Sequence, residues 1–236
     1  MKQKSIAVLR IREMILQGVL SAGERVREAD IAQRLGLSRT PIRQALPALA
    51  QEKLLVPSGK RGYSVRAFTA KESLEALELR ALLEGLAGRV LAHKGVSGEL
   101  LTELQACLKK GDAIFVKRKL SKRDELEYAE MNERFHRLIV EGADRPQLAE
   151  LVEQCNFIPF VAPVHIAFDL LPGGGMFELL SYAHQQHRFI VDAILSGDGA
   201  RAEFLLREHA QTQKQSLNLD SESRLHRQNQ TKPVFI

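Results

Sequence analysis

The chain has 236 residues, 44% of them hydrophobic, and a formal net charge of +5 at pH 7. This length accommodates two modest domains, and the composition allows an ordinary buried core. No apolar run approaches the roughly eighteen residues of a membrane span, and charged residues directly after residues 6–9 exclude a secretory signal, so we expect a cytoplasmic protein without a membrane partner.

The charge is distributed unevenly along the chain. Residues 1–70 contain 13 Lys and Arg against 5 Asp and Glu, whereas residues 71–236 contain 21 against 24. A basic segment joined to a slightly acidic one is typical of a polyanion-binding module attached to a module with another role. Charge alone does not distinguish nucleic acid from an anionic membrane surface, so the pattern within the basic segment has to decide.

The basic segment predicts three short helices. Apolar residues recur at helical spacing over residues 7–15, and a second helix is predicted over residues 28–35. Gly36 follows where helices often end in left-handed backbone, and Ser38 or Thr40 can cap the next helix. The buried face of that helix is predicted to contain Ile42, Ala45, Leu46 and Leu49. A helix, a glycine turn and a second helix with a basic start are typical of a helix-turn-helix.

A wing is predicted after the third helix. Residues 54–56 and 63–65 are short strand candidates, separated by a turn segment at residues 57–62 with two cations at its tip. A winged helix-turn-helix therefore accounts for the whole basic segment.

The cations of this segment are placed to contact DNA. We expect Arg39 and Arg43 to reach phosphates or guanine edges in the major groove, because a guanidinium matches guanine O6 and N7 bidentately. Lys60 and Arg61 would lie on or in the neighbouring minor groove, and Gly62 would allow close approach of the backbone. The alternative is that these cations simply form a solvent-exposed helix face. That alternative does not explain why the turn glycine, the cap and the wing follow one another in the order that a winged helix requires.

The stretch GERVREADIAQRLGLSRTPIRQALPALAQEKLLVPSGKRGYSV closely resembles the winged helix of GntR-type regulators, over roughly residues 5–67. The resemblance implies double-stranded operator DNA as the partner. It places the operator contacts at Ser38, Arg39, Thr40, Arg43 and the wing around Gly62.

Three residues depart from the family pattern. Gln44 stands where Glu is usual, and Lys53 where a glycine usually ends the helix. Pro47 lies inside the predicted recognition helix and lacks the N–H that would bond to residue 43. We expect this proline to bend or shorten the helix.

From residue 71 to about residue 217 the chain is predicted to be almost entirely helical. The amphipathic stretches after a first long helix cover roughly residues 97–118, 121–142, 146–160, 175–196 and 198–217. We therefore predict a mainly α protein with an N-terminal winged helix-turn-helix and a C-terminal antiparallel all-helical bundle. The expected divisions are a DNA-binding domain at 1–69, a linker at 70–73, an effector-, metal-binding and dimerisation domain at 74–217, and a flexible tail at 218–236.

Four residues of the predicted bundle could form a metal site. Asn132 and His136 lie one helical turn apart, and His187 and His209 lie on two later helices. Imidazoles on facing helices, joined by an oxygen ligand, are how helical bundles bind first-row metals. His184 could support such a site from outside it, but we expect this residue to be exposed.

Residues 131–136 and 186–209 resemble the ligand-binding FCD domain of the FadR subfamily, and the similarity is spread over residues 72–215. In that family, a carboxylate or Asn and three His hold a divalent metal. The matching positions here are Asn132, His136, His187 and His209, which implies zinc, nickel or manganese as the ion. Many relatives carry Asp in place of Asn132, and a neutral amide oxygen is a weaker ligand. Such a site would rely on an anionic effector to complete its shell.

Arg80 and Glu84 match the first-helix pattern of the same domain. An inward Arg80 could pair with a carboxylate of the effector, and a salt bridge in helix packing would explain it equally well.

We therefore expect a transcriptional regulator, in the commoner mode a repressor, rather than an enzyme. A homodimer would place two recognition helices on operator DNA, and a small carboxylate-bearing metabolite at the metal site would control affinity. Two alternatives stay open. The regulator could sense an organic effector without metal, or His136, His187 and His209 could form a catalytic metal triad, although no general base lies beside them.

Overall fold

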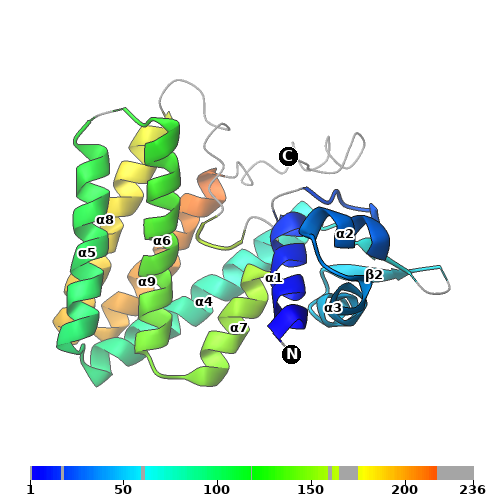
Figure 1. Cartoon of the computed structure of the whole chain (residues 1–236). Helices are drawn as coiled ribbons and strands as arrows, with labels where there is room; N and C mark the ends of the chain where they lie inside the picture. Colours follow the sequence, from blue (N-terminus) through cyan, green and yellow to red (C-terminus); the bar gives the residue numbers. More distant parts are fainter. Residues whose placement is uncertain are drawn as a thin grey trace. The chain divides into compact units, whose positions relative to one another are not determined.

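The computed structural model of the chain (Figure 1) describes residues 2–16, 19–59, 62–117, 119–158, 161–164 and 175–216. The chain divides into two compact units, one built mainly from Met1–Glu72 and the other from Ser73–Asn156 with Phe160–Glu222. Residues 70–73, expected as a linker, form the first turn of helix α4 (Ala70–Lys94). The expected tail at 218–236 lies outside the described residues.

The N-terminal unit is a winged helix-turn-helix. Its elements are α1 (Lys2–Leu16), β1 (Arg25–Val26), α2 (Glu28–Leu35), α3 (Arg39–Gln51), β2 (Leu55–Ser58) and β3 (Gly62–Val65). The strands form an antiparallel sheet of order β1-β3-β2. Apolar residues of all three helices and of the sheet share one core, which includes Ile11, Ile31, Ile42, Leu49 and Leu55.

The turn between α2 and α3 follows the predicted chemistry only in part. Gly36 has the left-handed backbone expected of a helix end, with a φ of 63°. Ser38 occupies the N-cap position of α3, but its side chain accepts no capping hydrogen bond. The backbone of α2 and the buried face of α3 therefore fix this turn without a side-chain cap.

The end of α3 differs from the expectation for Pro47. The helix continues through this proline to Gln51, and the proline side chain is exposed, so the expected shortening does not occur. Lys53, where the related proteins usually have glycine, has a φ of 60°. A side chain in left-handed backbone is strained, so this position is a small cost that the chain tolerates.

The C-terminal unit is the predicted antiparallel helical bundle (Figure 1). After α4 it contains α5 (Gly98–Phe115), α6 (Lys122–Gly142), α7 (Pro146–Asn156), α8 (Gly175–Leu195) and α9 (Gly199–Ser216). Helix α8 packs against both α5 and α9, and α6 packs against α5 and α7. No helix among the described residues is apolar over enough of its length to span a membrane.

Helices α4 and α9 approach closely because two small residues face α9. A Cβ on Gly88 would lie 2.3 Å from Leu206 Cδ1, and one on Gly85 would lie 3.1 Å from the backbone oxygen of Glu203. This contact brings the middle of α4, with Arg80 and Glu84, beside the helix that contains His209.

Candidate functional site

Four of the residues expected to contact DNA lie at the start of α3, and all four are exposed. These are Ser38, Arg39, Thr40 and Arg43. Lys60 and Arg61 lie outside the described residues.

Gly62 begins β3 directly after the turn of the wing and pairs with Ser58, the last residue of β2. A Cβ there would lie 2.8 Å from the backbone oxygen of Ser58. The requirement for glycine therefore arises within the hairpin itself, whether or not DNA is bound.

Arg43 does not extend alone into solvent, because it pairs with Glu28 on α2. Its Nε donates to both carboxylate oxygens at 3.0 Å, and its Nη2 donates to Oε2 at 2.8 Å. These hydrogen bonds lower the pKa of Glu28 below its ordinary value of 4.5, although burial acts in the opposite direction. The sequence pattern gave Glu28 no role, because the pairing depends on the angle between α2 and α3.

Three histidines meet in the interior of the helical unit. His136 comes from α6, His187 from α8 and His209 from α9, and all three are buried. One ring nitrogen of each lies within 4.8 Å of the others. The Nε2 atoms of His187 and His209 are only 3.0 Å apart. The structure thus brings together three of the four predicted metal ligands.

Two polar side chains fix the orientation of these rings. Glu84 Oε2 accepts a hydrogen bond from His136 Nδ1 at 2.9 Å, and Gln186 Oε1 accepts one from His209 Nδ1 at 2.9 Å. Nδ1 is therefore the donor of each of these two rings, because a carboxylate or an amide oxygen only accepts, and Nε2 is directed away from both partners. Partners of this kind orient histidines that bind metals.

Burial favours the neutral imidazole at two of the three histidines, His187 and His209. Burial lowers the pKa of His187 and of His209 well below 6.5, because it penalises the charged form. Burial alone would raise the pKa of Glu84, but Arg80 and then His136 lower it to about 2. The site therefore combines an ionised carboxylate with two imidazoles, those of His187 and His209, in the form that ligates metals.

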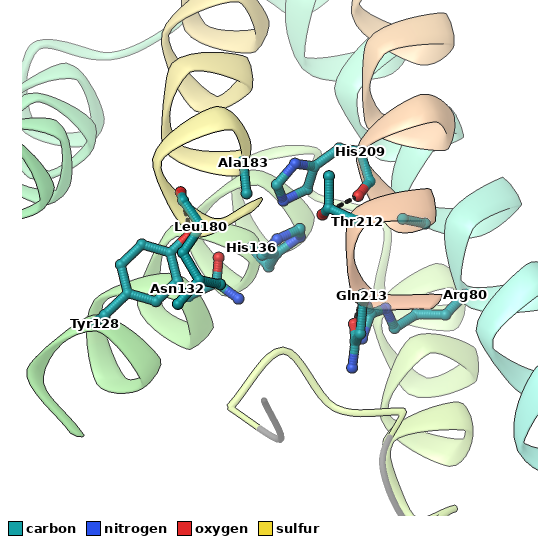
Figure 2. A pocket seen from close by; sticks show the side chains of 10 residues that line it. Arg80, Tyr128, Asn132, His136, Leu180, Ala183, His209, Thr212 and Gln213 are labelled. Carbon is teal, nitrogen blue, oxygen red and sulfur yellow. Dashed lines mark hydrogen bonds between the residues drawn. The ribbon is translucent and has the colours of Figure 1, made fainter. Parts of the chain in front are cut away.

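Asn132, the fourth predicted ligand, is buried beside two of the histidines with one amide oxygen unpaired. Its Nδ2 donates to the backbone oxygen of Pro163 at 2.7 Å, and a carbonyl only accepts, so Oδ1 must be the other atom of the amide. Among the described residues, none donates a hydrogen bond to this buried Oδ1. Asn132 lines the same cavity as His136 and His209 (Figure 2). An unpaired oxygen beside neutral imidazole nitrogens fits a divalent first-row ion.

Arg80 lies in the wall of this cavity, with 1% of its surface exposed. It donates to Val161 O and, at 2.9 Å, to Gln213 Oε1, and its Nε is 3.3 Å from Glu84 Oε1. The salt bridge that sequence alone left open is thus present, within α4. Figure 2 shows Arg80 beside Gln213 at the edge of the site.

The expectation that His184 is exposed was wrong. The residue is buried, its Nε2 is 2.9 Å from Asp112 Oδ1, and its ring stacks on Phe115. A Cβ on Gly111 would lie 2.1 Å from this ring, so α5 and α8 meet closely here. Its polar partner is on α5, but its ring also lies edge-on to that of His187, with 5.8 Å between the ring centroids, so His184 borders the histidine cluster.

The geometry agrees with comparisons to known families. The family described as "FCD domain" matches residues 75–212, and "Bacterial regulatory proteins, gntR family" matches residues 4–65. The chain belongs to the GntR family and has an FCD domain. GntR-family regulators bind operator DNA, and the relatives of this chain are transcriptional regulators rather than enzymes.

Two curated relatives illustrate the similarity. This GntR-family chain is 33% identical over 198 residues to the "Probable D-xylose utilization operon transcriptional repressor" of Paenarthrobacter nicotinovorans, which covers 83% of this chain and 80% of the relative. It is 31% identical over 152 residues to the "Uncharacterized HTH-type transcriptional regulator YdhC" of Bacillus subtilis, covering 62% of this chain and 63% of that relative. Among solved structures, "E. coli McbR/YncC" has the same fold, with a TM-score of 0.70, 21% identity and coverage of 96% and 98%.

Proposed function

We propose that this GntR-family protein is a cytoplasmic homodimeric repressor whose operator affinity is set by a metal-dependent effector site. A divalent ion, zinc, nickel or manganese, would be held by His136, His187, His209 and Asn132. A small carboxylate-bearing metabolite would then bind at the ion. The proposed operator contacts are Ser38, Arg39, Thr40, Arg43, Lys60, Arg61 and Gly62.

The observation that carries this proposal is the pair of Nε2 atoms of His187 and His209, which lie 3.0 Å apart. Gln186 holds the proton of His209 on Nδ1, so its Nε2 directs a lone pair at His187. That separation lets both nitrogens reach one ion at bond lengths of about 2.0–2.1 Å. When bound, the ion would supply a Lewis-acidic centre that attracts an anionic oxygen of the effector.

The cavity lined by Asn132, His136 and His209 has room for an ion but not for a metabolite. Its volume of about 20 Å³ suits one water molecule or one ion. A metabolite that bound without metal would first have to displace side chains of the wall. Under the proposal the ion occupies the cavity permanently, and the side chains of the wall move only when the effector binds.

A series of hydrogen bonds would couple effector binding to the rest of the helical unit. Arg80 and Gln213 hold Val161 O, Gln213 also holds Ala162 O, and Asn132 holds Pro163 O. An effector carboxylate that pairs with Arg80 would compete with these consecutive carbonyls. Effector binding would thereby release the segment 161–164, which lies between α7 and α8 in the chain.

The proposal is tested by measuring affinities for an operator duplex that the purified protein selects from random DNA. We expect small carboxylates to weaken operator binding by the metal-loaded protein and to have no effect after chelation. Because coupling between two ligands is reciprocal, the duplex should weaken effector binding by the same factor. Equal effector affinity with and without the duplex would contradict the proposal.

A further inference from the structure

The contact between Glu28 and Arg43 leaves part of the guanidinium unused. Glu28 takes the edge formed by Nε and Nη2. Among the described residues, none accepts a hydrogen bond from Nη1, and the Arg43 side chain is 71% exposed. A guanidinium has a second bidentate edge, formed by Nη1 and Nη2, and this edge faces away from the carboxylate.

A guanidinium that reads guanine needs one such edge directed at O6 and N7. An exposed arginine without a partner samples many rotamers, and fixing it on DNA costs entropy. The contact with Glu28 restricts Arg43 before DNA binds and joins two elements of the same unit, since Glu28 begins α2 and Arg43 lies in the second turn of α3. The acid is itself well placed, because a carboxylate is favoured in the first turn of a helix.

We propose that Glu28 is a positioning residue for sequence readout, which holds Arg43 by its Nε edge and presents the Nη1/Nη2 edge to a guanine of the operator. This inference rests on the proposed role of Arg43 as an operator contact. The negative charge of Glu28 repels DNA phosphates and therefore lowers the affinity for any DNA sequence. Its contribution is to discrimination between sequences, through the orientation of Arg43.

The experiment uses the 236-residue chain and three kinds of duplex. One is selected by the wild-type protein from random DNA, the second is that duplex with each guanine replaced in turn, and the third has an unrelated sequence. Glu28→Ala and Glu28→Gln are compared with Asp30→Ala, which removes a negative charge from the same helical turn without touching Arg43. Thermal unfolding checks that each variant is folded.

For Glu28→Ala we expect the unrelated duplex to bind as it does to Asp30→Ala. The selected duplex should bind to Glu28→Ala roughly 2- to 12-fold more weakly than to Asp30→Ala, because the variant must order the long side chain of Arg43 on binding. Adding Glu28→Ala to Arg43→Ala should cause no further loss, and discrimination at one guanine should fall in both single variants. Glu28→Gln, which keeps the shape but not the charge, should lie between Glu28→Ala and wild type.

The inference is overturned if Glu28→Ala binds the selected duplex as tightly as Asp30→Ala or more tightly, because Glu28 would then mask Arg43. It is also overturned if Arg43→Ala leaves discrimination unchanged. Failure of the wild-type protein to select any sequence would instead contradict the proposed function, so the two failures are distinguishable.

Discussion

Replacing Asn132 by Asp, the residue many FCD relatives have, should separate the stability of the helical unit from its affinity for metal. In the present structure Asn132 Nδ2 lies 2.7 Å from Pro163 O. In Asn132→Asp a carboxylate oxygen would occupy that position, and two acceptors would face each other without a proton. Loss of a buried hydrogen bond with one partner left unpaired costs about 1–3 kcal/mol.

The same exchange should strengthen metal binding, because a carboxylate is a better ligand for a divalent ion than a neutral amide oxygen. We therefore expect the metal-free variant to unfold roughly 2–12 °C below wild type, at about 2–4 °C per kcal/mol. The increase in Tm on adding zinc, nickel or manganese should be larger for the variant than for wild type.

Scanning calorimetry after chelation and after reloading with each metal measures both effects. Asn132→Ala is the matched control, since it loses the hydrogen bond and the ligand together and should show a low Tm with a reduced metal response. A metal-free Asn132→Asp protein as stable as wild type would refute the geometry at Pro163. An unchanged metal response would refute the role of Oδ1.

Three further predictions concern the framework. Gly62→Ala should destabilise the winged helix by about 1–3 kcal/mol in thermal unfolding, because its Cβ would lie 2.8 Å from Ser58 O, whereas Gly98→Ala, with no atom within 4 Å of its Cβ, should be neutral. Lys53→Gly should raise the free energy of unfolding in urea by about 0.5–1 kcal/mol, since it relieves left-handed backbone; a lower value would show that the turn is not strained. Hydrogen bonds from Ser121 and Lys117 hold the pKa of Asp124 below its ordinary value of 3.8, so the stability it contributes is complete above that pH and is lost as the pH falls below it. Asp124→Asn should flatten the dependence of Tm on pH in this acidic range, and an unchanged slope would count against these hydrogen bonds to Asp124.

Most of the fold could be predicted because its signals are local. Glycines and prolines mark the ends of helices, and amphipathic spacing places five helices of the bundle within a few residues of their bounds. Strand β1 was missed because two residues, Arg25 and Val26, cannot show an alternating pattern. Pro47 misled the prediction for α3, since a proline on the exposed side of a helix removes a hydrogen bond without ending the helix.

The site was predictable only for residues whose place on a helix, or whose match to a family motif, can be read from the sequence. The positions of His136, His187 and His209 follow from helical faces and from the resemblance to FCD domains. Glu84 and Gln186 hold two of these rings from other helices, which no spacing within one segment reveals. His184 was misjudged because α8 is buried on two sides, against α5 as well as against α9.

Elemental analysis of purified, untagged protein beside a His136→Ala/His187→Ala variant tests the proposed metal site most directly. We predict about one divalent ion per chain in the wild-type protein and none in the variant, because the variant removes two of three imidazole ligands. Absence of metal from the wild-type protein, even after incubation with zinc, nickel or manganese, would contradict the proposal. It would reduce the histidine cluster to a pocket for an organic ligand.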